Sequence, residues 1–349
     1  MKAAVYYKCG DASQIQMADV PEPQVRPGQA LIRVHASALN HIDLWSLHGP
    51  SDEATRFPVW TGSDVAGVIE RLAPDVSGWS AGEAVVINPS LSCSKCQRCI
   101  EGEVSQCDDY DILGNAGNGG NAEYIAANAD KLMRMPPGFD FLNAAAGPLA
   151  YQTAWRAVIS RARLQKGEDV LILGGSGGVA VATIQIGKML GARIFVITSS
   201  EEKMEKARLA GADFAVNRKT SNPFEEVRRL THGRGVDLVV ENVGALTWGE
   251  SQKILRKGGR IVTYGRTTGR EAVTNLSTLF WNEQTHIGST MGSLGDFHEV
   301  MTHIFNGTIT PVIDSVYPLE KAAQAYARYE RGEQFGKIVL QVRQAEIAS

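Results

Sequence analysis

The second half of the chain alternates apolar runs of strand length with segments of helical periodicity. An apolar run at 170–173 is followed by a glycine-rich stretch and then by an apolar segment with helical spacing through residue 190. The same alternation continues downstream. We predict a helix at 151–158, strands at 192–197, 214–216, 236–240 and 260–264, and helices at 201–210 and 224–231. Such alternation is typical of an α/β fold with a doubly wound parallel sheet.

The first 150 residues follow a different pattern, in which short alternating segments are separated by glycine and proline. This pattern favours a small β-rich barrel over a helical bundle. We predict strands at the N-terminus, at 29–36, 64–70, 84–87 and 122–126, and near Leu132. The final section adds amphipathic helices at 296–305 and 319–331 and ends in a strand at 336–342.

The composition is that of an ordinary globular protein, with 44% hydrophobic and 21% charged residues. A chain of 349 residues is long for one core and suggests two domains. The net charge of −3 and the lack of a basic run give no attraction to nucleic acid. No apolar segment approaches the roughly 20 residues that span a membrane, and the N-terminus does not resemble a secretory signal. We therefore expect a cytoplasmic protein that acts on a small molecule.

The stretch that links the run at 170–173 to the following helix fits a dinucleotide-binding fingerprint. Gly175, Gly177 and Ala180 occupy its small-residue positions, with alanine at the third. In that pattern Gly175 allows the tight turn and Gly177 lets the backbone approach the pyrophosphate, which binds at the positive end of the helix. The cofactor contacts predicted here are Gly175, Ser176, Gly177, Gly178 and Val179.

The end of the second predicted strand indicates which dinucleotide is used. NAD-specific enzymes carry an acidic residue there, which binds the ribose hydroxyls and would repel a 2′-phosphate. This chain has Ser199 and neighbouring hydroxyl residues at that place. Ser199, Lys203 and Arg218 are suited to bind the phosphate, Arg218 through a charge-assisted fork. Glu201 offers either a ribose contact or a helix N-terminal charge, so NADPH is the expected cofactor and NADH stays open.

Four cysteines in the first half follow the spacing C-x2-C-x2-C-x7-C. Close thiolates in a chain without secretory features indicate a tetrahedral zinc site, because disulfides are disfavoured in the cytosol and iron–sulfur spacings overlap only in part. Four protein ligands leave no position for water, so the zinc would be structural and would hold together the lobe at about 90–108. The predicted ligands are Cys93, Cys96, Cys99 and Cys107.

The β-rich first part, the four-cysteine lobe, the dinucleotide fold and a terminal Gly-Lys-Ile-Val-Leu strand together resemble the medium-chain dehydrogenase/reductase superfamily. The resemblance covers essentially the whole chain. It implies a GroES-like β-barrel catalytic domain formed by 1–150 and 293–349, and a Rossmann dinucleotide-binding domain formed by 151–292. It also implies an active site between the domains. A strand at 285–290 would pair across the sheet edge in a homodimer or in a tetramer of such dimers.

The chain departs from the zinc alcohol dehydrogenases of this superfamily at their catalytic metal. Those enzymes bind a second zinc through a cysteine, a histidine followed by glutamate, and a later cysteine or acid. The matching positions in this sequence are Asn40, Ser63 and 148–149, none of which supplies the expected ligand. The Leu-Asn and Gly-Ser-Asp segments are instead similar to zinc-free quinone reductases and reductases of activated double bonds.

The expected function is hydride transfer from NADPH to the activated C=C bond of an enone, enal or enoyl-thioester, or to a quinone. Hydride addition there creates an enolate, whose delocalised charge can be stabilised by hydrogen-bond donors in place of zinc. Two alternatives stay open. His41, Asp43 and Asp64 would form an altered metal site in a zinc-dependent alcohol dehydrogenase with atypical ligands. A relative that binds NADPH without catalysis is the other.

Two side chains are candidates for stabilising the enolate. Asn40 would donate from the barrel, and Tyr151 from the junction of the domains, where packing is the alternative role for a tyrosine. By the same resemblance the nicotinamide would lie near Val243 and Gly265, and Lys337 would help to hold the pyrophosphate. No residue identifies itself as the acid that protonates the α-carbon, and water is one source.

Overall fold

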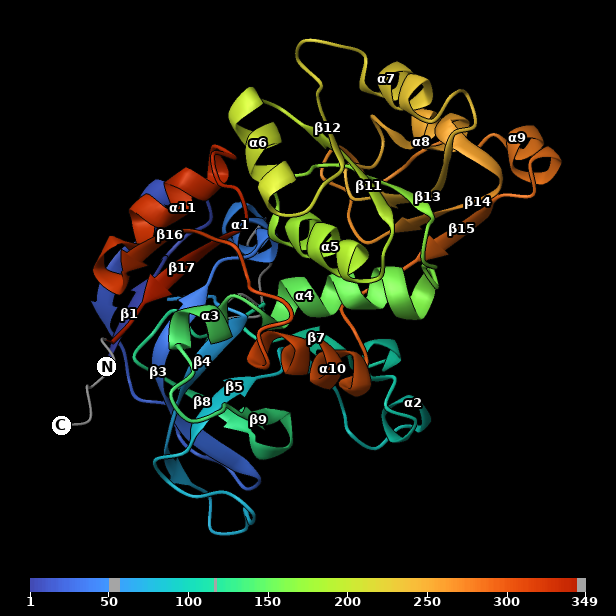
Figure 1. Cartoon of the computed structure of the whole chain (residues 1–349). Helices are drawn as coiled ribbons and strands as arrows, with labels where there is room; N and C mark the ends of the chain where they lie inside the picture. Colours follow the sequence, from blue (N-terminus) through green and yellow to red (C-terminus); the bar gives the residue numbers. More distant parts are fainter. Residues whose placement is uncertain (50–56, 116–117, 344–349) are drawn as a thin grey trace. The chain divides into compact units, whose positions relative to one another are not determined.

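The protein forms two compact units (Figure 1), the first made of residues 1–150 and 293–349 and the second of residues 151–292. The structure, a computed structural model, describes residues 1–49, 57–115 and 118–343. Each unit has its own sheet and its own hydrophobic core. Within the described residues, no helix combines the length and apolar character needed to cross a membrane.

The second unit is built on a six-stranded sheet with the strand order β12-β11-β10-β13-β14-β15, in which all neighbouring strands are parallel. The strands are β10 (Asp169–Ile172), β11 (Arg193–Thr198), β12 (Phe214–Asn217), β13 (Val236–Glu241), β14 (Leu255–Thr263) and β15 (Thr285–Gly288). Their apolar runs suit a parallel sheet that is buried on both faces. The strand order reverses between β10 and β13, which creates the kind of switch point at which doubly wound folds bind ligands.

Helices cover both faces of this sheet. They are α4 (Pro148–Trp155), which continues into the π-helical segment η4 (Arg156–Arg161), α5 (Gly178–Met189), α6 (Glu201–Leu209), α7 (Pro223–Leu230), α8 (Trp248–Ile254) and α9 (Leu276–Trp281). Figure 1 shows α5 and α6 on one face and α7 and α8 on the other. The core between β10–β14 and α7–α8 is aliphatic and aromatic, with Leu171, Phe195, Val227, Val239 and Ile261 fully buried.

Two buried aspartates tie the amino ends of β10 and β13 together. The backbone N–H of Asp169 donates to Asp237 at 2.8 Å. Arg234 lies 2.8 Å from the Asp169 carboxylate and 2.6 Å from that of Asp237. Arg193 adds an ion pair to Asp169 and Arg256 adds one to Asp237. This aspartate pair with its arginines links two strands that are not consecutive in the chain.

The first unit is a seven-stranded, mostly antiparallel sheet with the order β16-β17-β3-β4-β5-β9, in which β8 also pairs with β3. Its strands are β3 (Gln29–Ala38), β4 (Asp64–Leu72), β5 (Ala84–Ile87), β8 (Tyr124–Asn128), β9 (Leu132–Arg134), β16 (Ile313–Pro318) and β17 (Lys337–Gln341). Two hairpin-like pairs lie outside it, β1 (Lys2–Val5) with β2 (Gln16–Asp19) and β6 (Ser90–Leu91) with β7 (Asp111–Ile112). The C-terminal β17 joins the sheet beside β3 and so completes the unit from the far end of the chain.

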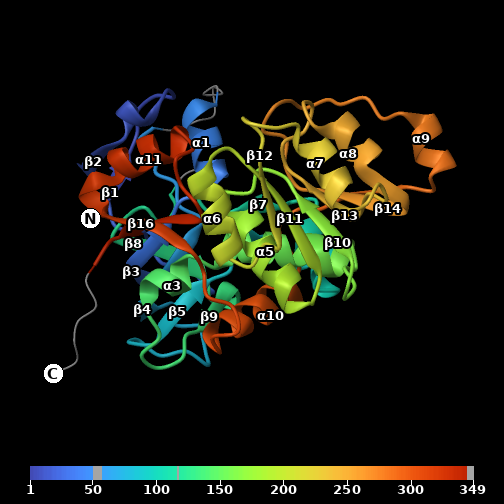
Figure 2. The same cartoon turned by 45° about the horizontal axis from the view of Figure 1, so that its top comes forward.

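Short helices close this unit. They are α1 (His41–His48), α2 (Gln97–Ile100), α3 (Phe141–Ala145), α10 (Leu294–Phe305) and α11 (Ala322–Glu330), with 3-10 turns η1 (Ala12–Gln14), η2 (Val104–Gln106), η3 (Ala129–Lys131) and η5 (Leu319–Lys321). Figure 2 shows α11 beside β16, and α11 also contacts β17. One core fills the space under α11, a second lies between β3, β4, β5 and β8, and a smaller one packs against β1.

The doubly wound sheet and the β-rich unit that the apolar pattern predicts are both present. The pattern does not predict α1, α8, α9 or β16. The exposed helix α9 has no buried residue and hence no apolar periodicity. Strand β14 starts at Leu255, earlier than predicted, because its first part runs through Gly258 and Gly259 and carries little apolar signal.

Candidate functional site

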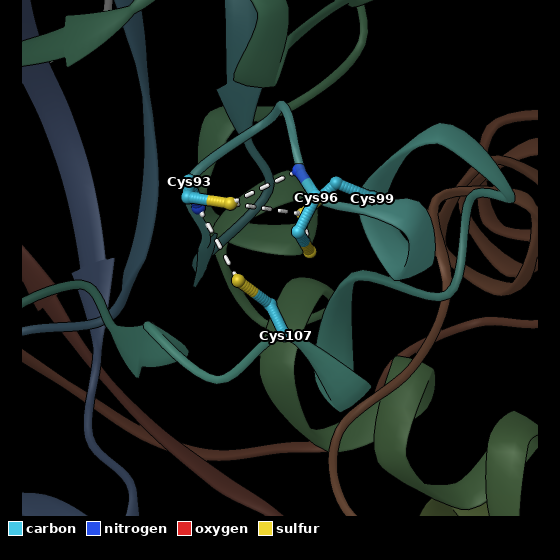
Figure 3. Close-up of side chains that lie close together, drawn as sticks. All are labelled: Cys93, Cys96, Cys99 and Cys107. Atoms are coloured by element: carbon cyan, nitrogen blue, oxygen red, sulfur yellow. Dashed lines mark hydrogen bonds between the residues drawn. The ribbon is translucent and has the colours of Figure 1, made fainter.

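The four predicted zinc ligands lie together in the lobe of the first unit that β6 and β7 close. Cys96 begins α2, Cys99 lies within it, and Cys107 follows η2. The Sγ atoms of these three and of Cys93 all lie within 4.8 Å of one another, and Figure 3 shows the four side chains directed towards one another. Two Sγ–Sγ distances are 3.6 Å and 3.9 Å. A tetrahedral zinc site requires about 3.8 Å between thiolates.

The surroundings of these sulfur atoms suit a closed metal site. The backbone N–H groups of Lys95 and Cys96 lower the pKa of Cys93 to about 6, and the pKa of Cys99 is also lowered. Despite backbone hydrogen bonds that act the other way, burial and hydrogen bonds with the neighbouring sulfur atoms raise the pKa values of Cys96 and Cys107. Tyr110 and Leu294 pack against the lobe and help to cover it. Because four sulfur ligands complete a tetrahedral shell, the cluster fits a structural zinc and leaves no position for a substrate.

Three glycines of the loop between β10 and α5, Gly174, Gly175 and Gly177, have different surroundings. Gly174 has φ +60°, so the left-handed turn falls on this residue and not on Gly175, where the fingerprint places it. Gly175 lies against β11, since a Cβ there would be 2.1 Å from Val196. At Gly177 a Cβ would meet only one backbone oxygen, at 3.8 Å. The loop therefore leaves open space at Gly177, beside the free N–H groups of the first turn of α5, where a pyrophosphate would fit.

The residues predicted to bind a 2′-phosphate gather at the carboxyl ends of β11 and β12. Thr198 pairs with Asn217 in the sheet, so the following residues Ser199 and Arg218 lie at the same edge. The ammonium of Lys203, in the first turn of α6, donates to the Ser176 hydroxyl of the glycine loop at 3.2 Å. The sequence predicts these residues as phosphate ligands, but it does not predict the contact between Lys203 and Ser176 of the glycine loop.

Glu201 lies beside this group but is held by a neighbour. The side-chain amide of Asn217 donates to its carboxylate at 2.9 Å. The carboxylate also sits in the first turn of α6, where the helix dipole favours a negative charge. Arg218 is exposed and extends beyond the end of β12. The edge therefore presents a guanidinium to solvent, while the nearest acid already has a partner.

Val243 and Gly265 lie in the turns that follow β13 and β14. The Glu241 carboxylate accepts the N–H of Val243 at 2.7 Å and that of Gly244 at 3.0 Å. The same carboxylate accepts the hydroxyls of Thr247 and Ser251. The turn after β13 is thus fixed by one buried side chain, at the switch point of the sheet.

The expected donor Asn40 lies in a buried network in the first unit, here called the Asp64 network and formed by Asn40, Asp43, Asp64 and Lys337. Sheet register assembles it, because Ala38 pairs with Asp64 in β4 and with Val339 in β17. The Lys337 ammonium lies 2.5 Å from the Asn40 side-chain oxygen and 2.8 Å from the Asp64 carboxylate. The Asn40 amide nitrogen donates to that carboxylate at 2.9 Å.

The remaining oxygens of the Asp64 network also have partners. The second Asp64 oxygen accepts the N–H of Leu149 at 2.6 Å. The Asp43 carboxylate accepts the N–H of Asn40 at 2.6 Å and that of Gly62 at 3.0 Å. Burial raises the pKa of Asp43 to about 6. The network is therefore a closed set of donors and acceptors, and its lysine is only 2% exposed.

Two predicted residues have partners that the sequence does not indicate. Lys337 was expected beside the pyrophosphate, but its ammonium is bound by oxygens of the first unit, including the Leu39 carbonyl at 2.8 Å. Tyr151 is 1% exposed, and its hydroxyl donates to Gln185 in α5 at 2.7 Å. For each of them a contact with cofactor or substrate would require these bonds to be exchanged.

Two family models match the chain: residues 26–137 match the alcohol dehydrogenase GroES-like domain, and residues 178–306 match the zinc-binding dehydrogenase. The NAD-dependent alcohol dehydrogenase of Sulfolobus acidocaldarius is 33% identical, over 98% of this chain and 100% of the relative. The chain belongs to the medium-chain dehydrogenase/reductase superfamily. The resemblance seen in the sequence and the expected fold class, a Rossmann sheet with a GroES-like barrel, are thereby confirmed.

Other members of this superfamily differ in their reactions. A solved structure of an NAD-dependent alcohol dehydrogenase is 38% identical, with a TM-score of 0.93, and covers 98% of this chain and 100% of its own. The crotonyl-CoA reductase of Streptomyces avermitilis is 30% identical, over 93% of this chain and 81% of the relative. The protein is thus an NAD(P)-dependent oxidoreductase, as expected.

The sequence leaves open an altered metal site formed by His41, Asp43 and Asp64. Both carboxylates of this set have their oxygens occupied by N–H donors, as described above. His41 is exposed, and its ring lies edge-on to Trp45 with centroids 5.1 Å apart. Within the part of the chain that the structure describes, only the four cysteines bring three or more potential ligand groups close enough to hold a metal.

The sequence does not indicate a role for one polar group near the Asp64 network, the hydroxyl of Ser63. Ser63 directly precedes β4 at a position where zinc alcohol dehydrogenases carry a histidine ligand. Its hydroxyl is buried and makes no hydrogen bond with any described residue. No sequence signal marks this hydroxyl, because a serine at a strand start usually finds a backbone partner.

Proposed function

We propose that this protein is an NADPH-dependent reductase that transfers hydride to a conjugated carbonyl compound, or to a quinone, without a metal at the reacting centre. The observation that carries the proposal is the Asp64 network. Where zinc alcohol dehydrogenases bind their catalytic metal, this chain has a buried lysine whose ammonium is paired with Asp64 and bonded to Asn40. Every carboxylate oxygen of this network already accepts a hydrogen bond, so a metal bound there would have to displace existing donors and the lysine.

Reduction of a conjugated carbonyl suits such a centre. A dinucleotide held at the glycine loop would supply the hydride that bonds to the β-carbon, and the π electrons of the acceptor would move to its carbonyl oxygen as an enolate. Hydrogen-bond donors stabilise this oxygen, and protonation of the α-carbon by water completes the reduction. The first unit supplies the Ser63 hydroxyl, which has no partner among the described residues. The Asn40 amide already donates to Asp64 and to the Ala38 carbonyl, so it would have to exchange one of these bonds to act as a donor. The hydroxyl of Tyr151, the other proposed donor, would first have to release Gln185.

The edge formed by β11 and β12 supports NADPH as the cofactor. Arg218 and Lys203 would supply positive charge to a 2′-phosphate, and Ser199 a hydroxyl donor. One oxygen of Glu201 accepts a hydrogen bond from Asn217, which holds this carboxylate in the first turn of α6. The similar alcohol dehydrogenases use NAD by name, which makes the choice of dinucleotide a direct test of this argument.

The second candidate function is zinc-dependent alcohol oxidation, which the names of the similar alcohol dehydrogenases favour. It requires a metal bound by residues other than the cysteines of the lobe. Against it stands the ion pair at the metal position, since removing a buried carboxylate from its lysine costs several kcal/mol. A NADPH-binding relative without catalysis is the third candidate.

An acceptor screen tests the three functions against one another. Purified protein is mixed with NADPH and, separately, with enones, enals, enoyl-thioesters and quinones, and the nicotinamide absorbance is followed. In parallel, alcohol oxidation is measured with NAD⁺ and NADP⁺, and zinc is counted by elemental analysis. We expect turnover of at least one conjugated acceptor and one zinc per chain. Good alcohol oxidation with a second, essential zinc would contradict the proposal, and binding without any turnover would favour the third candidate.

We further propose that two copies of the chain associate through the free edge of β15, as a dimer or as a tetramer of such dimers. β15 is the last strand of its sheet. Directly before it, α9 exposes Leu276, Phe280 and Trp281 at 69%, 67% and 73%. An unpaired strand edge beside exposed aromatic side chains is the usual make-up of a surface that another chain covers. We place the protein in the cytoplasm, because its zinc lobe needs reduced cysteines.

A further inference from the structure

Asn242 lies where the sheet of the second unit reverses its order. It directly follows β13, whose neighbours are β10 and β14. The parallel register pairs Ile172 with Val240, so Asn242 stands level with Gly174 of the glycine loop. The carboxyl ends of the two strands on either side of a switch point enclose the crevice in which doubly wound folds hold their ligands. Asn242 was not among the residues that the sequence marks.

The backbone around Asn242 is fixed by its neighbours. Glu241 accepts two N–H groups of the turn, as described above, and so sets the path of the chain. The Asn242 carbonyl accepts the N–H of Thr267 at 3.2 Å and its hydroxyl at 3.1 Å. The Val243 carbonyl accepts the N–H of Thr268 at 2.8 Å and its hydroxyl at 2.7 Å. Hydrogen bonds therefore link the turns after β13 and β14, and they fix the position of the Asn242 backbone from which its side chain extends.

The Asn242 side-chain oxygen is a buried polar atom without a hydrogen-bond partner among the described residues. The side chain occupies space that two glycines leave open. A Cβ on Gly174 would lie 2.9 Å from this oxygen and 3.0 Å from the amide nitrogen. A Cβ on Gly265 would lie 3.2 Å from the Asn242 Cβ. An unpaired buried amide oxygen is unfavourable, so its position between two glycine turns points to a partner that the chain itself does not contain.

We propose that the side-chain amide of Asn242 binds the ribose hydroxyls of the nicotinamide half of the cofactor. This inference rests on the proposed dinucleotide site. With the 2′-phosphate at Arg218 beyond β12 and the pyrophosphate at the start of α5, the remaining half of the dinucleotide continues across the switch point towards β13. An amide carries one acceptor and two donors, which match a vicinal diol. Asn242 is thus a positioning residue that fixes the ring from which hydride leaves.

Binding of two probes to full-length variants tests this contact. NADPH contains the nicotinamide ribose, whereas 2′,5′-ADP lacks it and contains only the phosphorylated adenosine end. Asn242→Leu replaces the amide by an apolar group of similar size, and Asn242→Ala removes it. We expect both variants to bind NADPH about tenfold or more weakly, as for the loss of a well-formed hydrogen bond, and to bind 2′,5′-ADP as the wild type does. Dissociation constants come from NADPH fluorescence and from calorimetry.

Thermal unfolding without cofactor gives an independent readout. Because the amide oxygen has no hydrogen-bond partner among the described residues, Asn242→Leu should leave the Tm of the free protein unchanged or raise it. NADPH should raise the Tm of this variant less than it raises the wild-type Tm. Unchanged NADPH affinity in both variants would overturn the inference and leave the proposed function intact. Equal losses for both probes would indicate a distorted loop and overturn it as well. A wild type that bound neither probe would overturn the proposed cofactor and this contact together.

Discussion

A buried ammonium is tolerated only where acceptors surround it, and Lys337 has a carbonyl, an amide and a carboxylate oxygen within hydrogen-bond distance. This set of partners explains why the lysine lies at the start of β17, beside β3. The same bonds restrict the role of Asn40, because its side-chain amide is bonded to both Asp64 and Lys337. The positive charge of the Asp64 network is therefore that of Lys337, and the pairing of β3 with β4 and β17 sets the positions of its residues.

Replacing Lys337 by Met should destabilise the protein by about 3–5 kcal/mol, because Asp64 would remain buried without its charge partner. Chemical unfolding measures this cost. The double variant Asp64→Asn/Lys337→Met should lose less than the sum of the two single variants, since it removes both charges. Affinity for 2′,5′-ADP should stay at the wild-type value. If Lys337→Met weakened NADPH binding while stability was unchanged, the lysine would act on the pyrophosphate instead.

Arg218 should decide the preference for NADPH. Arg218→Ala removes a charge-assisted contact with the 2′-phosphate and should weaken NADPH by about 10- to 100-fold while NADH changes less than about twofold. Lys203→Ala should act in the same direction. Lys206→Ala, also on α6 but paired with Glu202, is the matched control and should change neither affinity. Equal or better efficiency of the wild type with NADH would refute this assignment.

At the scale of elements, the four-cysteine lobe has little apolar content, so we expect its stability to depend on a bound zinc. Cys96→Ser removes one of four ligands and should lower the zinc content of the purified protein and the unfolding midpoint of the first unit, because metal binding contributes directly to folding. Hydrogen exchange should increase in β6, α2 and η2. Ratios of turnover among acceptors should stay constant, and Cys9→Ser should leave zinc unchanged. A change of acceptor preference in Cys96→Ser would show that the lobe shapes the reacting centre.

The aspartate pair should make the second unit sensitive to acid. Burial opposes ionisation of Asp237, but hydrogen bonds from Arg234, the Asp169 N–H and Arg256 lower its pKa to about 2 from 3.8. Between these two values the unfolded chain binds more protons than the folded one. The contribution of Asp237 is therefore complete above about pH 4 and is lost as the pH falls towards 2.

Asp237→Asn should lower stability at neutral pH by about 1–2 kcal/mol, in keeping with the partial exposure of the arginines. Its free energy of unfolding should also fall less steeply than that of the wild type between pH 4 and 2. Glu226→Gln breaks the exposed pair with Arg229 on α7 and should have almost no effect. Parallel acid slopes for wild type and Asp237→Asn would contradict the role of the aspartate pair.

Elements with a buried face are the ones that the sequence predicts. β5 is a continuous apolar run, β13 is apolar apart from Asp237 and Glu241, and both appear where the pattern places them. The helix α1 begins at Asn40, whose N–H is capped by Asp43, and this cap is a polar signal that hydrophobic periodicity does not contain. The left-handed turn at Gly174 likewise depends on the loop as a whole, since the fingerprint fits Gly175, Gly177 and Ala180 and does not include Gly174.

At the scale of the whole molecule, the residue types in the sequence indicate the chemistry. Which side chains become hydrogen-bond partners depends on the pairing of strands that are far apart in the chain. The cysteine spacing suffices for the metal lobe because all four ligands are close in the chain. Lys337 and Asn40 are 297 positions apart, and only the pairing of β17 with β3 brings them together. The free oxygen of Asn242 depends in the same way on the register of β10 and β13. Sequence patterns therefore predict the superfamily and the cofactor loop better than the groups at the reacting centre.

The last prediction concerns association of two copies through β15 and α9. A charge at Trp281 should disrupt an interface that covers this aromatic side chain, because an ionised group buried without a partner costs several kcal/mol. Trp281→Glu is therefore expected to be a monomer at micromolar concentration, whereas the wild type is a dimer or a tetramer. Leu209→Glu introduces the same charge on α6, at a side chain that is 80% exposed, and should keep the wild-type mass. Light scattering after size-exclusion chromatography measures all three. A monomeric wild type, or a Trp281→Glu variant with the wild-type mass, would rule out this surface, while dissociation by Leu209→Glu would move the interface to α6.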